Sequence, residues 1–228
     1  MAGTTAALPR RRIGRRPADP DGVSTQESIL SVAEQVFAEH GYVAASLREI
    51  AQRADVTQAL IIYYFGSKQK LFETLFKRRG LEVYRERQAL LDALMARPEP
   101  PTVRELITAY LTPQFALRQE GPQAMAFVRM QARLHHEPDE LALRLRREVY
   151  DSSTRNYIAA LEKVVPGLST ADAHWRMMFA VGTYLYMLSG FDRLSDVSEG
   201  RYTTDDTEEV VRRLTDFLVA GITAPPSD

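Results

Sequence analysis

The sequence predicts an all-α protein in which a small three-helix unit precedes a larger helical unit. Apolar residues recur at the three- and four-residue spacing of a helix face in one segment after another. Two of these segments open with a Ser followed three residues later by a Glu, the spacing of a helix-capping box. Alternation with a period of two is nowhere long enough to favour a strand.

The three-helix unit occupies residues 23–76. Its first helix starts at the capping box Ser24-Thr25-Gln26-Glu27 and ends at His40-Gly41, because Gly commonly terminates a helix. A second box, Ser46-Leu47-Arg48-Glu49, opens a short helix that ends near Ala54. The third helix runs from Thr57 as N-cap to Phe65, and Gly66 stops it.

The larger unit, residues 77–228, continues a long helix that Ser67 caps and that reaches from Lys68 to about Arg97. Five further helices are expected, separated by Pro and Gly. Their ranges are Val103 to Gln119, Gln123 to His136, Glu140 to Val165, Ala171 to Ser189 and Asp206 to Ile222. Pro113 inside the first of these predicts a kink or a split.

Composition excludes several classes of protein. The 228 residues include no Cys, so disulfides, thiolate metal sites and cysteine nucleophiles are absent, and a reducing cytoplasm is expected. The Arg-rich start has no apolar segment behind it, so we expect no secretory signal. The longest nearly uncharged run, 177–191, is shorter than the roughly 20 residues that cross a bilayer, so no membrane association is expected.

Charge is unevenly distributed along the chain. Residues 1–79 hold 12 Lys and Arg against 8 Asp and Glu, whereas residues 80–228 hold 17 against 22. Residues 1–22 lack a hydrophobic period and are expected to form a flexible basic arm. Its five Arg include Arg15 and Arg16, and the arm either enters a minor groove or is a solvated extension. A basic N-terminal segment followed by an acidic remainder suggests that the N-terminal segment contacts a polyanion.

Two short capped helices separated by about three residues, with a preceding helix to brace them, are the ingredients of a helix-turn-helix. In the third helix, the positions expected to face inward are Leu60, Ile61, Tyr64 and Phe65. Those expected to face outward are Gln58, Ala59, Ile62 and Tyr63. An amide, apolar groups and a phenol with no core to enter suit the major groove of DNA. The alternative is a small bundle that docks another protein.

Residues 24 to about 76 resemble the TetR/AcrR family of bacterial transcriptional regulators. The resemblance rests on Ile29-Leu30-x-Val32-Ala33, Phe37-x-x-x-Gly41-Tyr42, Ser46-Leu47-Arg48-x-Ile50-Ala51, Ala54-x-Val56-Thr57-x-Ala59-x-Ile61 and Tyr64-Phe65-x-Ser67-Lys68-x-x-Leu71. It implies a dimeric, all-α, DNA-binding protein, usually a repressor, whose second domain binds an effector. In such proteins the turn commonly carries Gly where Asp55 stands here, and the recognition helix commonly carries Tyr where Ile62 stands.

The resemblance assigns DNA contacts to particular residues. Together with the outward face of the third helix and the arm, the expected set is Arg15, Arg16, Ser46, Arg48, Thr57, Gln58, Ala59, Ile62, Tyr63, Tyr64 and Lys68. Ser46 and Arg48 would lie at the backbone and groove edge, and Lys68 would grip a phosphate. Tyr64 is left open between core packing and a phosphate contact.

Two sites are expected in the larger unit. Apolar residues on its last two long helices would form a homodimer interface of four helices: Trp175, Gly182, Leu185, Tyr186, Val210, Leu214 and Phe217. A second apolar set would line an effector pocket: Met125, Phe127, Met130, Arg133, Leu134, Tyr157, Met178 and Phe179. The alternative for the second set is a filled core. A loose likeness to the subgroup that responds to fatty acids or acyl-coenzyme A suggests an apolar effector.

The expected function is therefore a DNA-binding regulator, released from a palindromic operator by a small apolar effector. A constitutive DNA-binding protein and a helical carrier or enzyme are the alternatives. No phosphate-binding loop, nucleophile elbow or metalloprotease motif is present, so catalysis and a cofactor are not expected. His135 and His136 are interpreted as a solvated helix end, and no metal site is expected.

Overall fold

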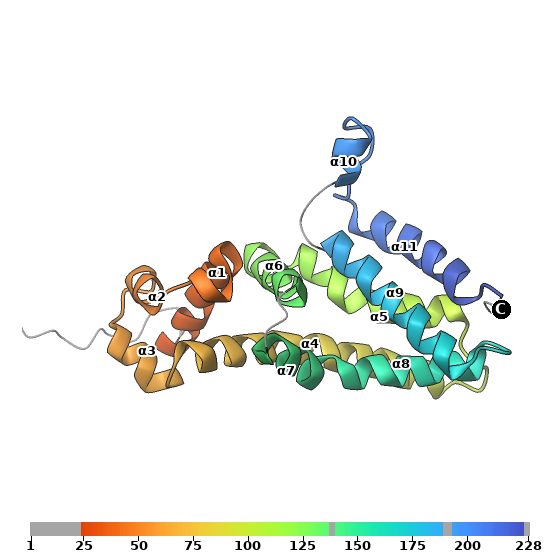
Figure 1. The fold of residues 1–228 in the computed structure, drawn as a ribbon, viewed down its shortest axis with the longest axis horizontal. Helices are drawn as coiled ribbons and strands as arrows, with labels where there is room; N and C mark the ends of the chain where they lie inside the picture. Colours follow the sequence, from red (N-terminus) through yellow and green to blue (C-terminus); the bar gives the residue numbers. More distant parts are fainter. Residues whose placement is uncertain (1–23, 137–139, 189–192, 226–228) are drawn as a thin grey trace, which may run out of the picture.

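The computed structural model describes residues 24–136, 140–188 and 193–225. Over these residues it contains helices and turns and no strand, which confirms the all-α prediction (Figure 1). The elements are α1 (Thr25–Ala44), α2 (Leu47–Arg53), α3 (Gln58–Phe65), α4 (Lys68–Met95), α5 (Val103–Ala116), the 3₁₀ turn η1 (Leu117–Gln119), α6 (Pro122–His136), α7 (Glu140–Val149), α8 (Asp151–Val164), α9 (Thr170–Leu188), α10 (Arg193–Val197) and α11 (Thr207–Ile222).

The first four helices begin where the sequence predicts. The side chains of Ser24, Ser46, Thr57 and Ser67 each accept a hydrogen bond of 3.1 to 3.2 Å from the backbone N–H three residues later. The Glu side chain of each predicted capping box pairs with an arginine: Glu27 accepts a hydrogen bond from Arg78, and Glu49 forms an ion pair with Arg53. The Ser half of each box is therefore the part that starts the helix.

Left-handed backbone conformations mark the boundaries within the small unit. Gly41 (φ 75°) interrupts α1, and Gly66 (φ 79°) ends α3 with its N–H bonded to the Ile62 carbonyl at 2.8 Å. Asp55 has a φ of 52° in the turn between α2 and α3. A non-Gly residue adopts this conformation at some cost, and Asp does so more readily than most. Asp55 thus forms the turn between α2 and α3 in a left-handed conformation.

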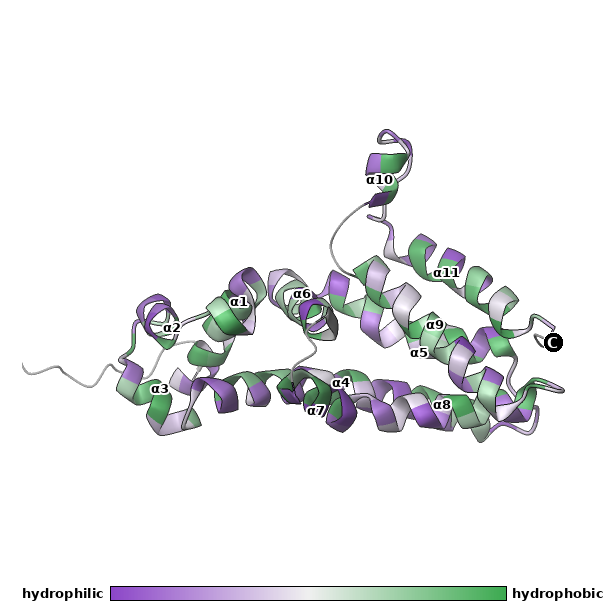
Figure 2. Ribbon diagram, in the orientation of Figure 1, coloured by the Kyte–Doolittle hydropathy of each residue, from purple (hydrophilic) through white to green (hydrophobic). Residues whose placement is uncertain are grey.

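Helix α4 connects two parts of the molecule, which we name the head (α1–α3) and the body (α5–α11) (Figure 1). Its first turns place Leu71 and Phe72 in the core of the head, and its later turns place Val83 and Leu91 in the body. Helix α6 of the body also packs along α1. Hydrophilic and hydrophobic residues interleave along α4, as expected of a helix with a buried side (Figure 2).

The body differs from the prediction in three places. The helix expected over 140–165 is two helices, because the chain breaks at Tyr150 (φ −113°), whose ring packs edge-on against Phe76 of α4. The neighbouring Val149 approaches α4 so closely that a Cβ at Gly80 would clash with it. Helix α5 continues through Pro113, without the expected kink or split there, and tightens into η1 four residues later, at Leu117. Helix α10 was not predicted.

In the described parts of the chain, none of the helices is both long enough and apolar enough to span a lipid bilayer.

Candidate functional site

Helix α3 presents an exposed face at the end of the molecule that lies farthest from the body (Figure 1). Gln58 and Ala59 are exposed, as are Ile62 (43%), Tyr63 (80%) and Tyr64 (41%). The four residues predicted to face outward do so. The inward prediction holds for Ile61 and Phe65, whereas Leu60 is half-buried and Tyr64 is exposed.

Packing holds this face in a fixed orientation. Ile61 and Phe65 belong to one apolar core with Ile29, Phe37 and Leu71, which come from α1 and α4. In the turn before α3, the Val56 N–H bonds to the Ala51 carbonyl at 2.9 Å. The exposed side chains of α3 therefore project from a braced support, as recognition requires.

The first turn of α2 adds a polar edge to the same face. Ser46 is exposed, and its oxygen accepts the Glu49 N–H at 3.2 Å, which leaves its own O–H free to donate. Arg48, two residues later in the same turn, is also exposed. Hydroxyl and guanidinium donors are the groups that contact DNA phosphates.

Lys68 stands at the start of α4, beside α3. Its Nζ donates a hydrogen bond of 3.0 Å to the Val43 carbonyl and lies 4.9 Å from the centre of the Tyr42 ring. Partial burial lowers the pKa of its ammonium group. An ammonium group has three donors, so Lys68 can hold the end of α1 and still donate to a phosphate. Arg15 and Arg16 lie outside the described residues.

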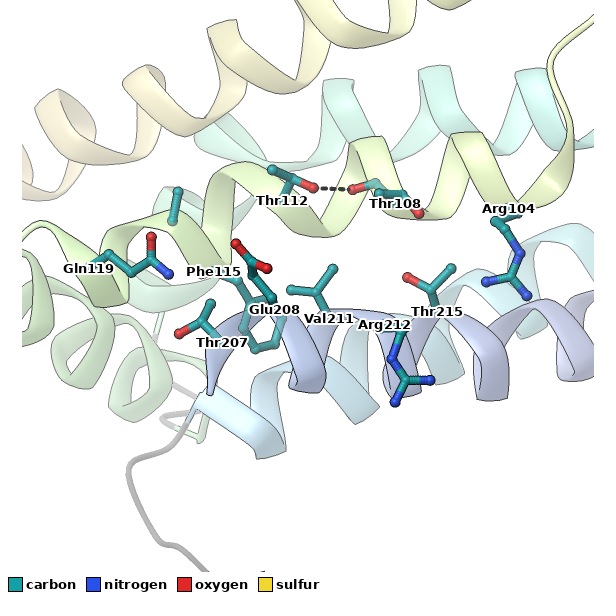
Figure 3. Close-up of a pocket in the computed structure, with 11 residues that line it drawn as sticks. Arg104, Thr108, Thr112, Phe115, Gln119, Thr207, Glu208, Val211, Arg212 and Thr215 are labelled. Carbon is teal, nitrogen blue, oxygen red and sulfur yellow. Dashed lines mark hydrogen bonds between the residues drawn. The ribbon is translucent and has the colours of Figure 1, made fainter. Parts of the chain in front are cut away.

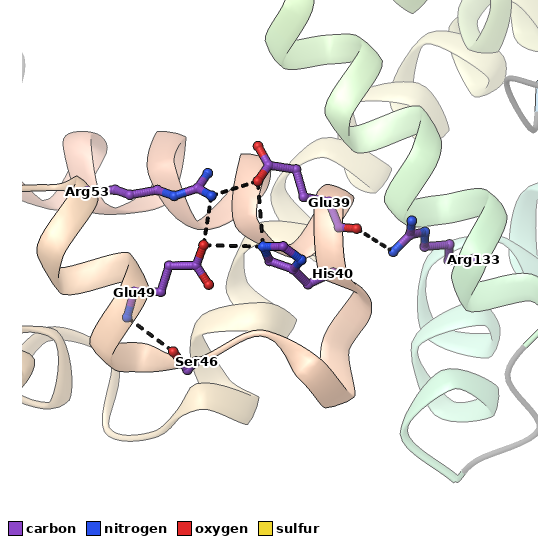
Figure 4. Close-up of polar contacts among 6 residues, drawn as sticks. All are labelled: Glu39, His40, Ser46, Glu49, Arg53 and Arg133. Atoms are coloured by element: carbon purple, nitrogen blue, oxygen red, sulfur yellow. Dashed lines mark hydrogen bonds and ion pairs between the residues drawn. The ribbon is translucent and has the colours of Figure 1, made fainter.

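A polar cluster on α1 and α2 is a feature that the sequence reasoning missed (Figure 4). Arg53 bonds Glu39 at 2.8 Å and Glu49 at 2.7 Å, and the His40 Nε2 lies 3.2 Å from Glu49. The ligand-type atoms of Glu39, His40 and Glu49 lie within 4.8 Å of one another. Because Arg53 pairs with both carboxylates, the cluster is best explained as an ion-pair network that fastens α2 to α1.

The residues predicted for an effector pocket lie in three different environments. Phe127 and Tyr157 are fully buried, and the Tyr157 hydroxyl donates to the Arg87 carbonyl at 2.8 Å. Met178 (48%) and Phe179 (63%) are exposed on α9, so their predicted interior location is wrong. Helix α9 is apolar on more than one side, and the prediction chose the wrong side of it.

Three residues of the same set lie where α6 meets the head. Met130 and Leu134 are buried, and Arg133 donates a hydrogen bond of 3.0 Å to the Glu39 carbonyl (Figure 4). With Phe37 and Phe72, among others, they line a cavity of about 10 Å³, room for about one water molecule. Met125 on the same helix is half-buried. These residues join the head to the body.

A larger groove, of about 410 Å³, lies between α5 and α11 (Figure 3). Four Thr line it, with Phe115 and Val211 as its main apolar walls: Thr108, Thr112, Thr207 and Thr215. The hydroxyl of Thr215 is buried without a hydrogen-bond partner among the described residues. The sequence reasoning missed this groove, although the spacing of Thr108 and Thr112 by four residues was a visible signal.

The predicted dimer residues fall on two sides of their helices. Trp175 (65%), Tyr186 (56%) and Phe217 (66%) are exposed, and so is Gly182. Leu185 is half-buried. Val210 and Leu214 are 6% exposed and pack into the core of their own subunit, so the outward position predicted for these two is wrong. The exposed residues form an apolar surface on α9 and α11.

Two family models match the chain. The model described as the tetracyclin repressor-like C-terminal domain matches residues 108–221, half of the chain. The model described as bacterial regulatory proteins of the tetR family matches residues 29–81, which include the whole of α2 and α3.

Curated relatives share this similarity over part or most of their length. The transcriptional repressor BepR of Brucella suis is 26% identical over 75% of this chain and 80% of its own. The transcriptional repressor NicS of Pseudomonas putida is 29% identical over 55% of this chain. The chain spans 57% of the length of NicS, a little over half.

Solved structures share the fold. The fatty acid degradation regulator FadR of Bacillus halodurans has a TM-score of 0.63 and 18% identity, and the match covers 92% of this chain and all of that one. FadR of Bacillus subtilis, solved in complex with stearoyl-CoA, has a TM-score of 0.62 and 18% identity over 85% of this chain and 97% of its own. From the two family models and this shared fold, the chain belongs to the TetR family of bacterial regulatory proteins.

Proposed function

We propose that the protein is a DNA-binding transcriptional repressor of the cytoplasm that binds a palindromic operator as a homodimer. The observation that carries the proposal is the exposed face of α3, which offers Gln58, Ile62 and Tyr63 on a braced helix. An amide can pair with adenine, an apolar side chain can contact a thymine methyl, and a hydroxyl can reach a phosphate. Because the relatives BepR and NicS are both named as repressors, repression is proposed rather than activation.

Dimerisation is proposed to use the exposed apolar surface of α9 and α11. Trp175, Phe179 and Phe217 are each more than 60% exposed in the single chain, and burial against a second copy would remove this apolar area from water. A two-fold arrangement would place the two α3 helices about 34 to 36 Å apart, one turn of the DNA duplex. Such spacing requires a palindromic or nearly palindromic operator.

Release by a small effector is proposed for the body. The groove between α5 and α11 exceeds the roughly 300 Å³ at which ligand pockets begin, which counts against a constitutive DNA-binding protein. The stearoyl-CoA complex of Bacillus subtilis FadR supports an effector with an apolar part. Binding in the body would reach the head through α4 and through the contact of α6 with α1. A coupling free energy of about 1 to 3 kcal/mol corresponds to a 5- to 150-fold loss of operator affinity.

Footprinting on the DNA upstream of the protein's own gene tests this function. The proposal expects one protected region with two-fold symmetry, and protection that weakens steeply as the salt concentration rises. Absence of protection on this DNA at modest ionic strength, together with a monomeric protein in solution, would contradict it.

A further inference from the structure

The core of the body contains a fully buried arginine. Arg87 of α4 is 0% exposed, and its Nε donates a hydrogen bond of 2.7 Å to the Tyr110 carbonyl. Its guanidinium carbon lies 4.0 Å from the centre of the Tyr110 ring and 5.5 Å from that of Tyr184. Its Nη2 is buried and has no hydrogen-bond partner within the described part of the chain.

The positive charge of Arg87 is not balanced by a negative one. Across residues 24–136, 140–188 and 193–225, no carboxylate forms an ion pair with it, and the groups that act on its charge are the phenols of Tyr110, Tyr184 and Tyr150. The phenols around it do not supply the charge, because burial raises the pKa of Tyr157 and of Tyr184 and keeps both protonated. A guanidinium does not lose its proton in a protein, and buried charges are otherwise paired. The body therefore holds a cation that lacks a counter-ion.

Hydrogen-bonding groups from four helices surround this position. Tyr110 of α5 approaches Thr154 of α8 at 3.1 Å, Tyr157 of α8 donates to the Arg87 carbonyl, and Tyr184 comes from α9. Arg87 itself belongs to α4, the helix whose first turn adjoins α3. A ligand bound at Arg87 would thus contact the helix that leads to the head.

We propose that Arg87 anchors an anionic effector, a molecule with one carboxylate on an apolar body. The inference rests on the proposed function, since it names the chemical class of the effector; it places the carboxylate at Arg87 in the core of the body, which is not part of the lining of the groove between α5 and α11. The planar fork of a guanidinium matches the two oxygens of a carboxylate, and Nη2 supplies an unused donor for it. Because Arg87 is closed off from solvent, the carboxylate reaches it only when α8 or α9 shifts relative to α4. That shift is the displacement that a switch requires.

The other explanation is that Arg87 is a structural residue that the aromatic rings alone stabilise. The two explanations predict opposite effects of removing the charge. A structural arginine stabilises the ligand-free fold, so that an uncharged replacement lowers the melting temperature. An arginine that awaits a counter-ion destabilises the ligand-free fold, so that the same replacement leaves the melting temperature unchanged or raises it.

Thermal unfolding of the full chain without ligand makes the first test. We expect Arg87→Met to unfold at the wild-type temperature or about 2 to 4 °C above it. Arg85→Met on the exposed side of the same helix is the matched control, and Arg87→Lys retains the charge in case the Met variant does not fold. A melting temperature of Arg87→Met clearly below that of the wild type and of Arg85→Met would overturn the proposal.

Matched probes make the second test at constant ionic strength: octanoate against octanamide, and benzoate against benzamide. We expect at least one carboxylate to raise the melting temperature of the wild type and of Arg85→Met more than its amide does. The rise should be smaller in Arg87→Lys and absent in Arg87→Met. The proposal is overturned if each amide matches its carboxylate or if Arg87→Met keeps the response.

Failure of this inference is distinguishable from failure of the proposed function. Binding of the wild type to its upstream DNA is measured without any probe, and its absence contradicts the function but not the carboxylate preference. DNA binding together with equal responses to carboxylates and amides contradicts the role of Arg87 alone.

Discussion

Helix α3 and the α9–α11 surface both expose large side chains, but the side chains differ in kind. On α3 they are the Gln58 amide, the apolar Ile62 and two phenols, with Arg48 and Lys68 nearby. On α9 and α11 the most exposed are the rings of Trp175, Phe179 and Phe217. The rings of Trp175 and Phe179 contact each other within the subunit in a tilted arrangement, with ring centres 5.9 Å apart.

The cations near the two surfaces also differ in what they do. Arg176 of α9 donates three hydrogen bonds to backbone carbonyls at the end of α11, two of 2.7 Å and one of 3.1 Å. It is therefore occupied within the subunit, where it supports the end of a helix. Arg48 of the head is exposed. Large exposed side chains indicate a nucleic-acid-binding surface when hydrogen-bond donors and unpaired cations lie beside them. Where such donors and cations are missing, the same exposure indicates a protein–protein interface.

The largest expected effect comes from a charge on the apolar surface. Phe179→Asp should yield a monomer, because two copies of the Asp would have to be buried at the two-fold interface. Loss of the second head should weaken operator binding by about 10²- to 10⁴-fold. Light scattering measures the mass and fluorescence anisotropy the affinity. Leu143→Asp, at an exposed apolar position on α7, is the control and should remain dimeric.

A smaller loss is expected on α3. Tyr63→Ala removes a side chain that is 80% exposed, so the fold should be unaffected. Loss of one base or phosphate contact per head, at about 1 to 3 kcal/mol each, should weaken operator binding at least tenfold. Tyr202→Ala, at an exposed Tyr in the body, should bind as the wild type does. Equal affinities of all three proteins for the operator would remove Tyr63 from the interface.

Lys68→Ala should reduce the salt dependence of DNA binding and leave the preference for particular bases unchanged. Each lost phosphate contact reduces the slope of log K against log salt by about 0.9, and the two subunits lose one each. The variant also loses the bond to the Val43 carbonyl, so its melting temperature is measured alongside. Lys163→Ala on α8 is the control. A slope equal to that of the control would show that Lys68 serves only to hold α1.

The smallest expected effect concerns Glu34 of α1, which is 5% exposed beside Arg79. Burial raises the pKa of Glu34 above its ordinary value of 4.5, and Arg79 and Arg78 offset this only in part. A raised pKa in the folded state means that Glu34 contributes stability below about pH 4.5 and that this contribution is lost as the pH rises through the folded pKa.

Glu34→Gln should therefore gain stability relative to the wild type as the pH rises from about 4.5 towards neutrality. Denaturant unfolding at a series of pH values measures the difference. Glu208→Gln on α11, at an exposed position, is the control. A difference between Glu34→Gln and the wild type that does not change with pH would contradict the expected sign.

The helix boundaries of the head could be predicted from the sequence because short-range interactions determine them. Ser24, Ser46, Thr57 and Ser67 cap their helices because a short side-chain oxygen satisfies an unpaired N–H wherever it stands at a helix start. Gly41 interrupts α1 and Gly66 ends α3 because Gly adopts positive φ readily. The outward face of α3 followed from the same local periodicity, except at Tyr64.

The body depends more on tertiary packing, which one sequence does not display. The break at Tyr150 interrupts an apolar period that continues through it, since α7 and α8 both pack on α4. Met178 and Val210 each lie on helices with more than one apolar side, so periodicity could not decide which side faces the core. A buried Arg87 runs against the usual exposure of arginine, and only the fold shows it.

The most direct test of the central claim, that α3 reads DNA bases, compares two duplexes in an anisotropy titration. One carries the protected palindrome and the other the same bases in scrambled order, and the proteins are the wild type and Gln58→Ala/Tyr63→Ala. We expect the wild type to prefer the palindrome by about 10³-fold or more and the double variant to lose most of that preference while it retains weak, salt-sensitive binding to both. An undiminished preference in the double variant would contradict the account.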